Sequence, residues 1–243
     1  MSYPINYPTP QGANVQIFET TSDWVKPQGA SFVWFTLIGA GGGAGSITST
    51  LYNGGGGGSG AVTNYMGPAF LMPDVLRISI GLGGISIAGT NGTAGGTTDV
   101  IYQTKDGTGY TLLTANGGGG GGTAGAAGAA GAASTSNFFS AAGFFQSVAG
   151  QAGNPGVTAS PTTFLGGGAG GTTANSVPTA NYGYTAAGNS AGFFLMQPII
   201  VGVGGSASAT GEDGGIGCGG GGNPYINVVA GSGGNGFAVV ITW

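Results

Sequence analysis

Short apolar runs alternate with glycine tracts along the chain, and the runs have the composition of β-strands. Each run contains β-branched or aromatic residues and is bounded by Gly, Asp, Asn or Pro, which is typical of strands separated by turns. None has the spacing of apolar positions that an amphipathic helix requires. The pattern predicts an all-β protein without substantial α-helix. The runs are ASFVWFTLIGA from Ala30, DVLRISIGLGG from Asp74, TDVIYQT from Thr98, YTLLTANGG from Tyr110, QPIIVGVGG from Gln197 and GFAVVITW at the C-terminus.

Two of these runs, SFVWFTLIG and FAVVITW, are apolar on both faces. Such strands are costly at a sheet edge, so we expect them to be neighbours in one β-sandwich-like sheet. Before them, the stretch QIFETTSDWVKPQGA predicts a strand around Ile17 and a turn at Pro27–Gly29. Trp24 is then expected to cover the edge of the first sheet.

The chain divides into an arm and one domain. Residues 1–14 have proline at positions 4, 8 and 10, which predicts an extended, polyproline-like N-terminal arm. Residues 15–243 are expected to form a single glycine-rich β domain. The N-terminus lacks the basic and apolar regions of a signal peptide, and no stretch approaches about 18 uninterrupted apolar residues. We therefore expect neither export nor membrane insertion.

The glycine tracts have an order of their own. In GGGGGGTAGAAGAAGAA, Gly122, Gly125, Gly128 and Gly131 fall at every third position, the period of an extended helix with three residues per turn. A silk-like stack would require the two-residue period of a strand, and collagen triplets would contain proline. The period favours a bundle of polyglycine-II-type helices that form lateral hydrogen bonds and meet at crowded glycine contacts. A flexible linker is the alternative.

The chain also contains an imperfect internal duplication. LIGAGGGAG from Leu37 resembles FLGGGAGG from Phe164, and SIGLGGISIAGTNG from Ser79 resembles IVGVGGSASATGEDG from Ile200.

Composition favours an ordered protein over a disordered one. Glycine supplies 59 of 243 residues, an amount that by itself suggests low complexity. Hydrophobic residues nevertheless make up 40% and aromatic residues 10% of the chain, more than is typical of disordered chains. Ordering so much glycine costs about 1–2 kcal/mol of backbone entropy per residue. We therefore expect dense backbone hydrogen bonding and assembly into a homo-oligomer, with a trimer favoured.

Charge argues against two classes of function. The net charge is −4, and Lys26, Arg77 and Lys105 are the only cations, so no basic surface can neutralise the phosphates of a nucleic acid. The chain has no histidine, and Glu212 and Asp213 are its only adjacent carboxylates, which leaves little for general acid–base catalysis. We expect no enzyme activity and no cofactor.

Two features could bind a metal or react. Glu212 and Asp213 lie beside glycines and could bind Ca²⁺ through carboxylate and carbonyl oxygens, but a solvated turn is favoured because no further acidic residue is near in sequence. Cys218 is the only cysteine. We expect it to be a small buried hydrophobe among glycines, with an exposed reactive thiol as the alternative.

Paired phenylalanines are the candidate contact residues. They have two interpretations: they fill a satellite core or subunit interface, which we favour, or they join two tyrosines in an exposed pad for a glycan or an outer-membrane protein. The residues are Phe138, Phe139, Phe144 and Phe145 in SNFFSAAGFFQS, Tyr182 and Tyr184 in NYGYT, and Phe193 and Phe194 in GNSAGFFLMQP.

An ordered set of motifs carries a family resemblance. DWVKPQGASFVWFTLIGAGGGAG, GGGGGSGA, SIGLGG and GSGGNGFAVVITW together resemble the glycine-rich domain of tail-fibre and other structural proteins of tailed bacteriophages, over residues 24–243. The glycine tracts are similar to the polyglycine sandwiches of phage tail-fibre-tip adhesins, in which a rigid slab of glycine helices holds variable loops at its end. The long apolar strands depart from that pattern and imply a β-sheet beside the slab.

The resemblance implies a non-enzymatic virion protein, assembled in the host cytoplasm. We expect a tail-fibre or tail-tip component that contributes to recognition of a host receptor. A capsid decoration or head-fibre protein that contacts other virion proteins through the N-terminal arm is an alternative. A secreted surface or matrix protein is a second alternative, although such a protein would normally have an export signal.

Overall fold

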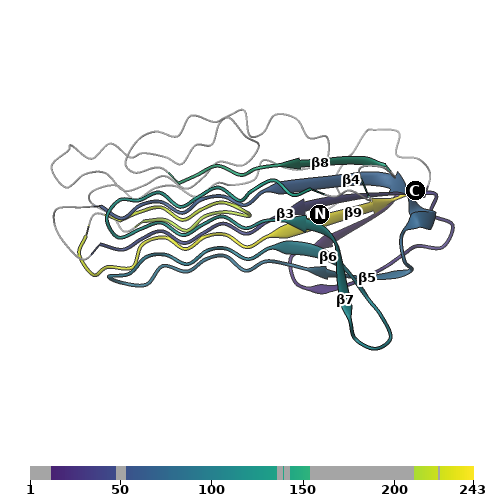
Figure 1. The fold of residues 1–243 in the computed structure, drawn as a ribbon, viewed down its shortest axis with the longest axis horizontal. Helices are drawn as coiled ribbons and strands as arrows, with labels where there is room; N and C mark the ends of the chain where they lie inside the picture. Colours follow the sequence, from purple (N-terminus) through teal and green to yellow (C-terminus); the bar gives the residue numbers. More distant parts are fainter. Residues whose placement is uncertain (1–11, 48–52, 136–138, 140–142, 154–210, 224) are drawn as a thin grey trace.

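The computed structural model describes residues 12–47, 53–135, 139, 143–153, 211–223 and 225–243. This part of the chain is all-β, as predicted, and its strands form two antiparallel sheets with a glycine bundle at one end (Figure 1). The first sheet has the order β1-β9-β3-β4-β8 and the second has the order β2-β5-β6-β7. The strands are β1 (Asn14–Phe18), β2 (Ser22–Val25), β3 (Phe32–Ile38), β4 (Val62–Pro68), β5 (Val75–Ser79), β6 (Thr98–Gln103), β7 (Gly109–Ala115), β8 (Phe144–Val148) and β9 (Phe237–Thr242), with a short 3-10 turn η1 (Ala69–Leu71) after β4.

The two strands expected to be neighbours, β3 and β9, pair over six residues, with Phe35 opposite Val240. Both lie inside the first sheet, flanked by β4 and β1. Alternate residues of β3 point to the second sheet, so Phe35 and Leu37 are fully buried. The prediction from their two-sided apolar pattern is confirmed.

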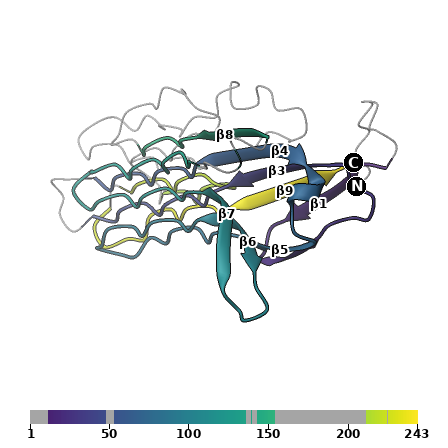
Figure 2. The same ribbon diagram turned by 45° about the vertical axis from the view of Figure 1, so that its right-hand side comes forward.

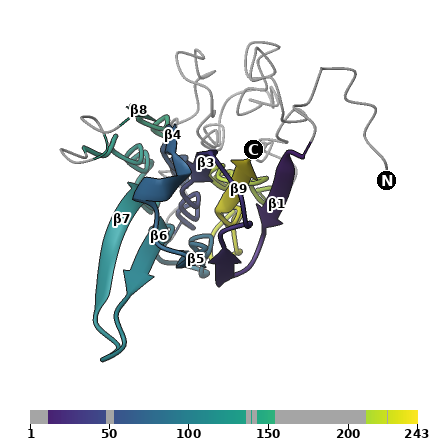
Figure 3. The same ribbon diagram turned by 90° about the vertical axis from the view of Figure 1, so that its right-hand side faces the viewer.

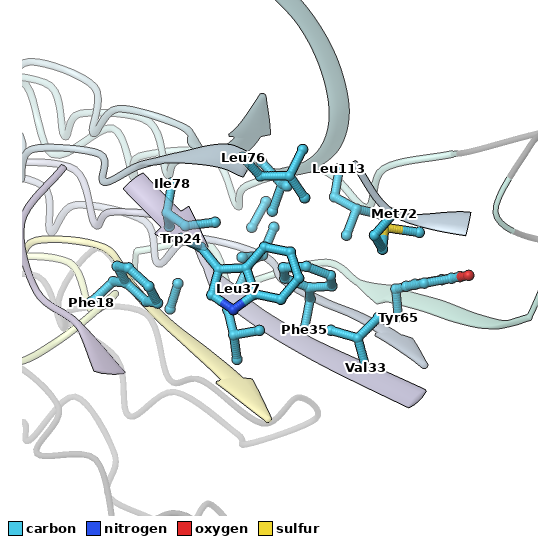
Figure 4. Close-up of a cluster of buried hydrophobic side chains, with 14 of the residues drawn as sticks. Phe18, Trp24, Val33, Phe35, Leu37, Tyr65, Met72, Leu76, Ile78 and Leu113 are labelled. Atoms are coloured by element: carbon cyan, nitrogen blue, oxygen red, sulfur yellow. The ribbon is translucent and has the colours of Figure 1, made fainter. Parts of the chain in front are cut away.

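Trp24 lies in the core between the two sheets, so the prediction that it covers an edge of the first sheet is wrong. It is fully buried and packs edge-on against Phe35, with ring centroids 5.5 Å apart. Strand β2 belongs to the second sheet, where Trp24 is opposite Leu76 of β5. Strand alternation then points the indole into the core (Figure 4), while its neighbours Asp23 and Val25 are exposed.

Glycine tracts continue the strands of both sheets and extend away from the sandwich in one direction (Figure 1). Their far end is called the tip. Seven tracts adjoin a strand: residues 39–47 after β3, 53–61 before β4, 80–87 after β5, 90–97 before β6, 116–122 after β7, 149–153 after β8 and 229–236 before β9.

Backbone hydrogen bonds of the 39–47 tract repeat every third residue. The N–H groups of Gly39, Gly42 and Gly45 donate to carbonyls of the 53–61 tract at 2.9 Å. The next residue of each triplet donates to the 90–97 tract, and the third residues of the first two triplets, Gly41 and Ala44, donate to the 229–236 tract. A three-residue period confirms the polyglycine-II-type arrangement and accounts for three neighbours at three directions around one helix.

Carbonyl groups of the same tract point to three further neighbours. Those of Ala40, Gly41 and Gly42 accept from Gly118, Gly84 and Gly220, at 2.9, 2.8 and 3.0 Å. Gly220 belongs to a further glycine tract, residues 211–223, so the 39–47 tract is surrounded by six tracts and bonded to each. Facing β-sheets lie about 10 Å apart because side chains fill the space between them. Here the glycine tracts that continue the two sheets are hydrogen-bonded to one another, which requires that no side chain lies between them.

The stretch from Gly117 forms two antiparallel tracts joined by a turn. Gly119 donates to Ala129 and Gly122 donates to Ala126, both at 2.7 Å. Gly125 lies in the turn with a φ of 79°, so this glycine is required by its conformation and not, as expected, by a crowded contact. Its partners in the period, Gly128 and Gly131, do lie against neighbouring backbone.

Parts of two sequence predictions lie outside the described residues. These are the second copies of the internal duplication, from Phe164 and Ile200, and the strand expected from Gln197.

Candidate functional site

The paired phenylalanines that the structure describes lie at the sandwich end of the molecule. Phe139 is buried and packs on Tyr65, with ring centroids 4.5 Å apart. Phe145 in β8 packs partly buried against the same core, and Phe144 is 56% exposed. Phe138, Tyr182, Tyr184, Phe193 and Phe194 lie outside the described residues.

The tyrosine beneath Phe139 serves the core. Tyr65 is fully buried, and burial raises the pKa of its phenol above the usual value. The group therefore stays neutral at physiological pH, which fits a packing role.

A different surface gathers exposed apolar side chains at the tip of the bundle. Three turns form it: residues 87–91, residues 123–126 and residues 223–229. We define the tip surface by six residues of these turns: Ile87, Asn91, Thr123, Tyr225, Ile226 and Val229. The four apolar members are each between 40 and 50% exposed.

Hydrogen bonds join the three turns into one surface. The N–H of Thr123 donates to the Asn91 side chain at 2.9 Å, which joins the second turn to the first. The Ser46 hydroxyl accepts from Gly89 at 2.9 Å and donates to the carbonyl of Val228 at 2.6 Å, which joins the first turn to the third. Ser46 itself is fully buried at the end of the 39–47 tract. The bundle therefore fixes the relative positions of the turns.

One buried amide shapes the third turn. The Asn223 side chain accepts from the N–H of Tyr225 and donates to the carbonyls of Val228 and Val229, each at 3.3 Å. Asn227 has a φ of 54°, a left-handed conformation that asparagine tolerates better than most residues. These features hold Tyr225 and Ile226 outward from the bundle end.

The chemistry of the tip surface suits binding. None of the residues in its three turns is charged, and the surface combines an aromatic ring, aliphatic side chains and amide groups. An aromatic side chain supplies a large contact area at low entropic cost. The signal that could have identified these residues is the isolated large apolar side chain between Gly and Asn or Pro, as in GGISIAGTNG and GNPYINVVAG.

The remaining candidate residues have structural surroundings. The Asp213 carboxylate accepts from the N–H of Ser232 at 2.7 Å, and Cys218 is buried, as predicted. Among the described residues no three His, Cys, Asp or Glu side chains are grouped as metal ligands would be. No helix in this part of the chain has the length and apolar content to span a membrane.

Comparison with known proteins gives one result that bears on the whole domain. No curated protein matches the sequence. The family model described as glycine-rich domain matches residues 17–243, a range that covers all the described glycine tracts and every strand except the first three residues of β1. The chain therefore belongs to the glycine-rich domain family.

Proposed function

We propose that this chain is a non-enzymatic bacteriophage virion protein, a tail-fibre or tail-tip component whose tip surface contributes to recognition of a host receptor. One observation carries the proposal: a bundle of hydrogen-bonded glycine tracts holds three turns together as an uncharged, partly apolar surface at its far end. The resemblance of the motifs to phage fibre proteins supplies the viral context.

Rigidity favours recognition by such a surface. Binding normally costs about 0.5–1.5 kcal/mol for each mobile side chain that becomes ordered, and more for each loop. The tip turns are already fixed by Ser46 and Asn223, both fully buried. A receptor that docks on them would meet a preformed surface, so little ordering entropy opposes binding.

The low charge of the chain points to the chemistry of the receptor. With three cations and seven anions over 243 residues, long-range steering and salt bridges contribute little to binding. An aromatic and aliphatic surface with amide groups fits the faces of sugar rings or an apolar patch of an outer-membrane protein. Binding should therefore depend only weakly on ionic strength.

Adsorption measurements test the proposal. Purified chain should bind susceptible cells and compete with phage adsorption, and affinity should change by less than about threefold between 50 and 500 mM salt. The double variant Tyr225→Ser, Ile226→Ser should weaken binding at least about tenfold, which is 1.4 kcal/mol. The matched control is Val25→Ser, an exposed apolar residue of β2, and it should bind as wild type does. Equal binding by both variants would remove the tip surface from recognition.

Electron microscopy distinguishes the fibre from the alternative location. Antibody against the chain should label tail fibres or tail tips of negatively stained particles. Label confined to heads would replace this proposal with the capsid decoration or head-fibre function, and the absence of label on any particle would leave a cellular surface or matrix protein.

A further inference from the structure

A groove runs along the open side of the β-sandwich, between β7 and the segment 133–135. Its volume is about 500 Å³. Leu112, Leu113 and Phe145 give it an apolar part, and the other lining residues are small or polar: Thr111, Thr114, Asn116, Ala133, Ser134 and Thr135.

Among the residues that the structure describes, strand β7 borders this groove with an edge that pairs with no further strand. It is the last strand of the second sheet among those that the structure describes. Its sequence GYTLLTA contains no charge and no proline, the devices by which proteins usually prevent an edge from pairing with another strand. The opposite edge strand, β2, contains Asp23 and is followed by Lys26 and Pro27.

The open part of the edge is its first half. Near the bundle, β7 is closed onto the first sheet, because the Thr114 carbonyl accepts from the Thr63 hydroxyl at 2.7 Å and the Asn116 carbonyl accepts from Ala61 at 2.8 Å. From Gly109 to Leu113 the strand diverges as part of a hairpin that projects from the body (Figures 2 and 3).

Residues 1–11 of the N-terminal arm lie outside the described residues, and their sequence suits such an edge. In a β-strand, residues of the same parity direct their N–H groups to the same side. All three prolines of the arm, at positions 4, 8 and 10, have even numbers. The odd-numbered residues therefore keep a complete row of donors on one side, while proline prevents pairing on the other.

The same alternation of odd and even positions determines which side chains of the arm share a face. If the arm is extended as a strand, Tyr3, Ile5 and Tyr7 share one of its faces. This apolar face matches the apolar part of the groove, formed by Leu112, Leu113 and Phe145.

The position of the arm disfavours pairing within the same chain. Strand β1, to which the arm is joined, lies four strand positions from β8 in the first sheet, about 19 Å at a spacing of 4.8 Å, and Phe145 of β8 lines the groove. From Asn14 back to Tyr7, seven residues span at most about 25 Å when fully extended. Because Figure 3 shows β1 and β7 on opposite sides of the molecule, an arm of the same chain would have to use this length to pass around the sandwich, whereas the arm of a second copy would not.

We propose that the N-terminal arm of one chain adds as a strand to the β7 edge of a second copy, with Tyr3, Ile5 and Tyr7 in its groove. The contact joins two different surfaces and is therefore head-to-tail, so it generates a closed ring such as a trimer or, if the rotation does not close, a filament. This inference concerns assembly and does not depend on the proposed receptor function.

Proline substitutions in the full chain test whether the N–H groups of the odd-numbered arm residues are the ones that pair with β7. Ile5→Pro removes a pairing donor, whereas Asn6→Pro adds a fourth proline on the side that already carries three. In sedimentation experiments over a concentration series, wild type and Asn6→Pro should assemble with similar constants. Ile5→Pro should associate at least tenfold more weakly. A peptide of residues 1–12 should dissociate the wild-type assembly, and its Ile5→Pro form should not.

A second pair of variants tests the groove. Thr135→Trp fills it and should weaken assembly at least tenfold, whereas Ala94→Trp, on an exposed part of the 90–97 tract, should not. A wild-type chain that remains monomeric at 100 μM would overturn the proposal. Equal association of Ile5→Pro and Asn6→Pro, or of the two Trp variants, would overturn it as well. Receptor binding by a monomeric chain would leave the proposed function standing.

Discussion

Replacing one glycine of the 39–47 tract by alanine should destabilise the whole domain. Gly42 is buried, and a Cβ atom built on it would lie 2.0 Å from the carbonyl oxygen of Gly119. Ordinary carbon–oxygen contacts are about 3.3 Å or longer. The Gly42→Ala variant must therefore separate this tract from the neighbouring 116–122 tract by about 1.3 Å.

The cost follows from the hydrogen bonds between these two tracts. Gly118 donates to Ala40 and Gly121 donates to Gly43, both at 2.9 Å, and a separation of this size breaks them. Each broken bond leaves buried polar groups without a partner, at about 1–3 kcal/mol. Alanine restricts the unfolded chain more than glycine does, which offsets part of this loss by stabilising the folded state by about 0.4–1 kcal/mol. We expect a net loss of about 2–5 kcal/mol, a large part of the 5–15 kcal/mol typical of a domain.

Urea denaturation followed by tryptophan fluorescence measures this loss. The matched control is Gly109→Ala in β7, where a Cβ would meet only a methyl group of Ile101 at 3.3 Å; its free energy of unfolding should stay within about 0.5 kcal/mol of wild type. If Gly42→Ala is as stable as the control, the tracts do not pack as described.

Three further predictions concern the sandwich and its hairpin. Trp24→Ala should lower the free energy of unfolding by about 3–5 kcal/mol, because the fully buried indole leaves a large cavity; calorimetry checks this, and a loss below 1 kcal/mol would contradict it. Deleting residues 236–243 removes β9 from between β1 and β3 and should abolish cooperative unfolding; a retained cooperative melt would argue against the pairing. The Thr104 hydroxyl and the Thr108 N–H hydrogen-bond the Asp106 carboxylate and lower its pKa. The stabilisation this gives the hairpin turn should be present above the ordinary aspartate pKa and lost as pH falls through the lower folded value. The Thr108 amide resonance should follow that titration in NMR spectra, and Asp106→Asn should abolish it.

Side-chain patterns predicted the sandwich because the apolar and polar positions of a strand indicate which of its faces are buried and whether it lies inside a sheet. The two-sided apolar pattern of β3 and β9 correctly placed them together inside one sheet. The period of three in GAAGAAGAA likewise identified the polyglycine arrangement. Trp24 was misplaced because a single buried aromatic residue does not reveal which of two sheets its strand joins.

The arrangement of the glycine tracts could not be predicted in the same way. A tract such as GGGGGG has no side chains that distinguish one neighbour from another, so nothing in it indicates that residues 39–47 bond to six other tracts. The order of five of those tracts follows from the described strands to which they are connected. The tip surface was missed for a related reason, since Ile87 and the neighbours Tyr225 and Ile226 are few large side chains in turns between glycine tracts, while the phenylalanine pairs gave a stronger compositional signal.

Hydrogen exchange of the glycine amides tests the rigid bundle most directly, because both the fold and the proposed recognition surface depend on it. In NMR experiments on labelled protein, the amides of Gly39, Gly42 and Gly45 should exchange only with opening free energies close to that of global unfolding. The amide of Gly107, in the exposed hairpin turn, should exchange far more readily. If the tract amides exchange at the rates of an unstructured glycine-rich linker, the tracts do not form a hydrogen-bonded bundle and cannot hold the tip surface in place.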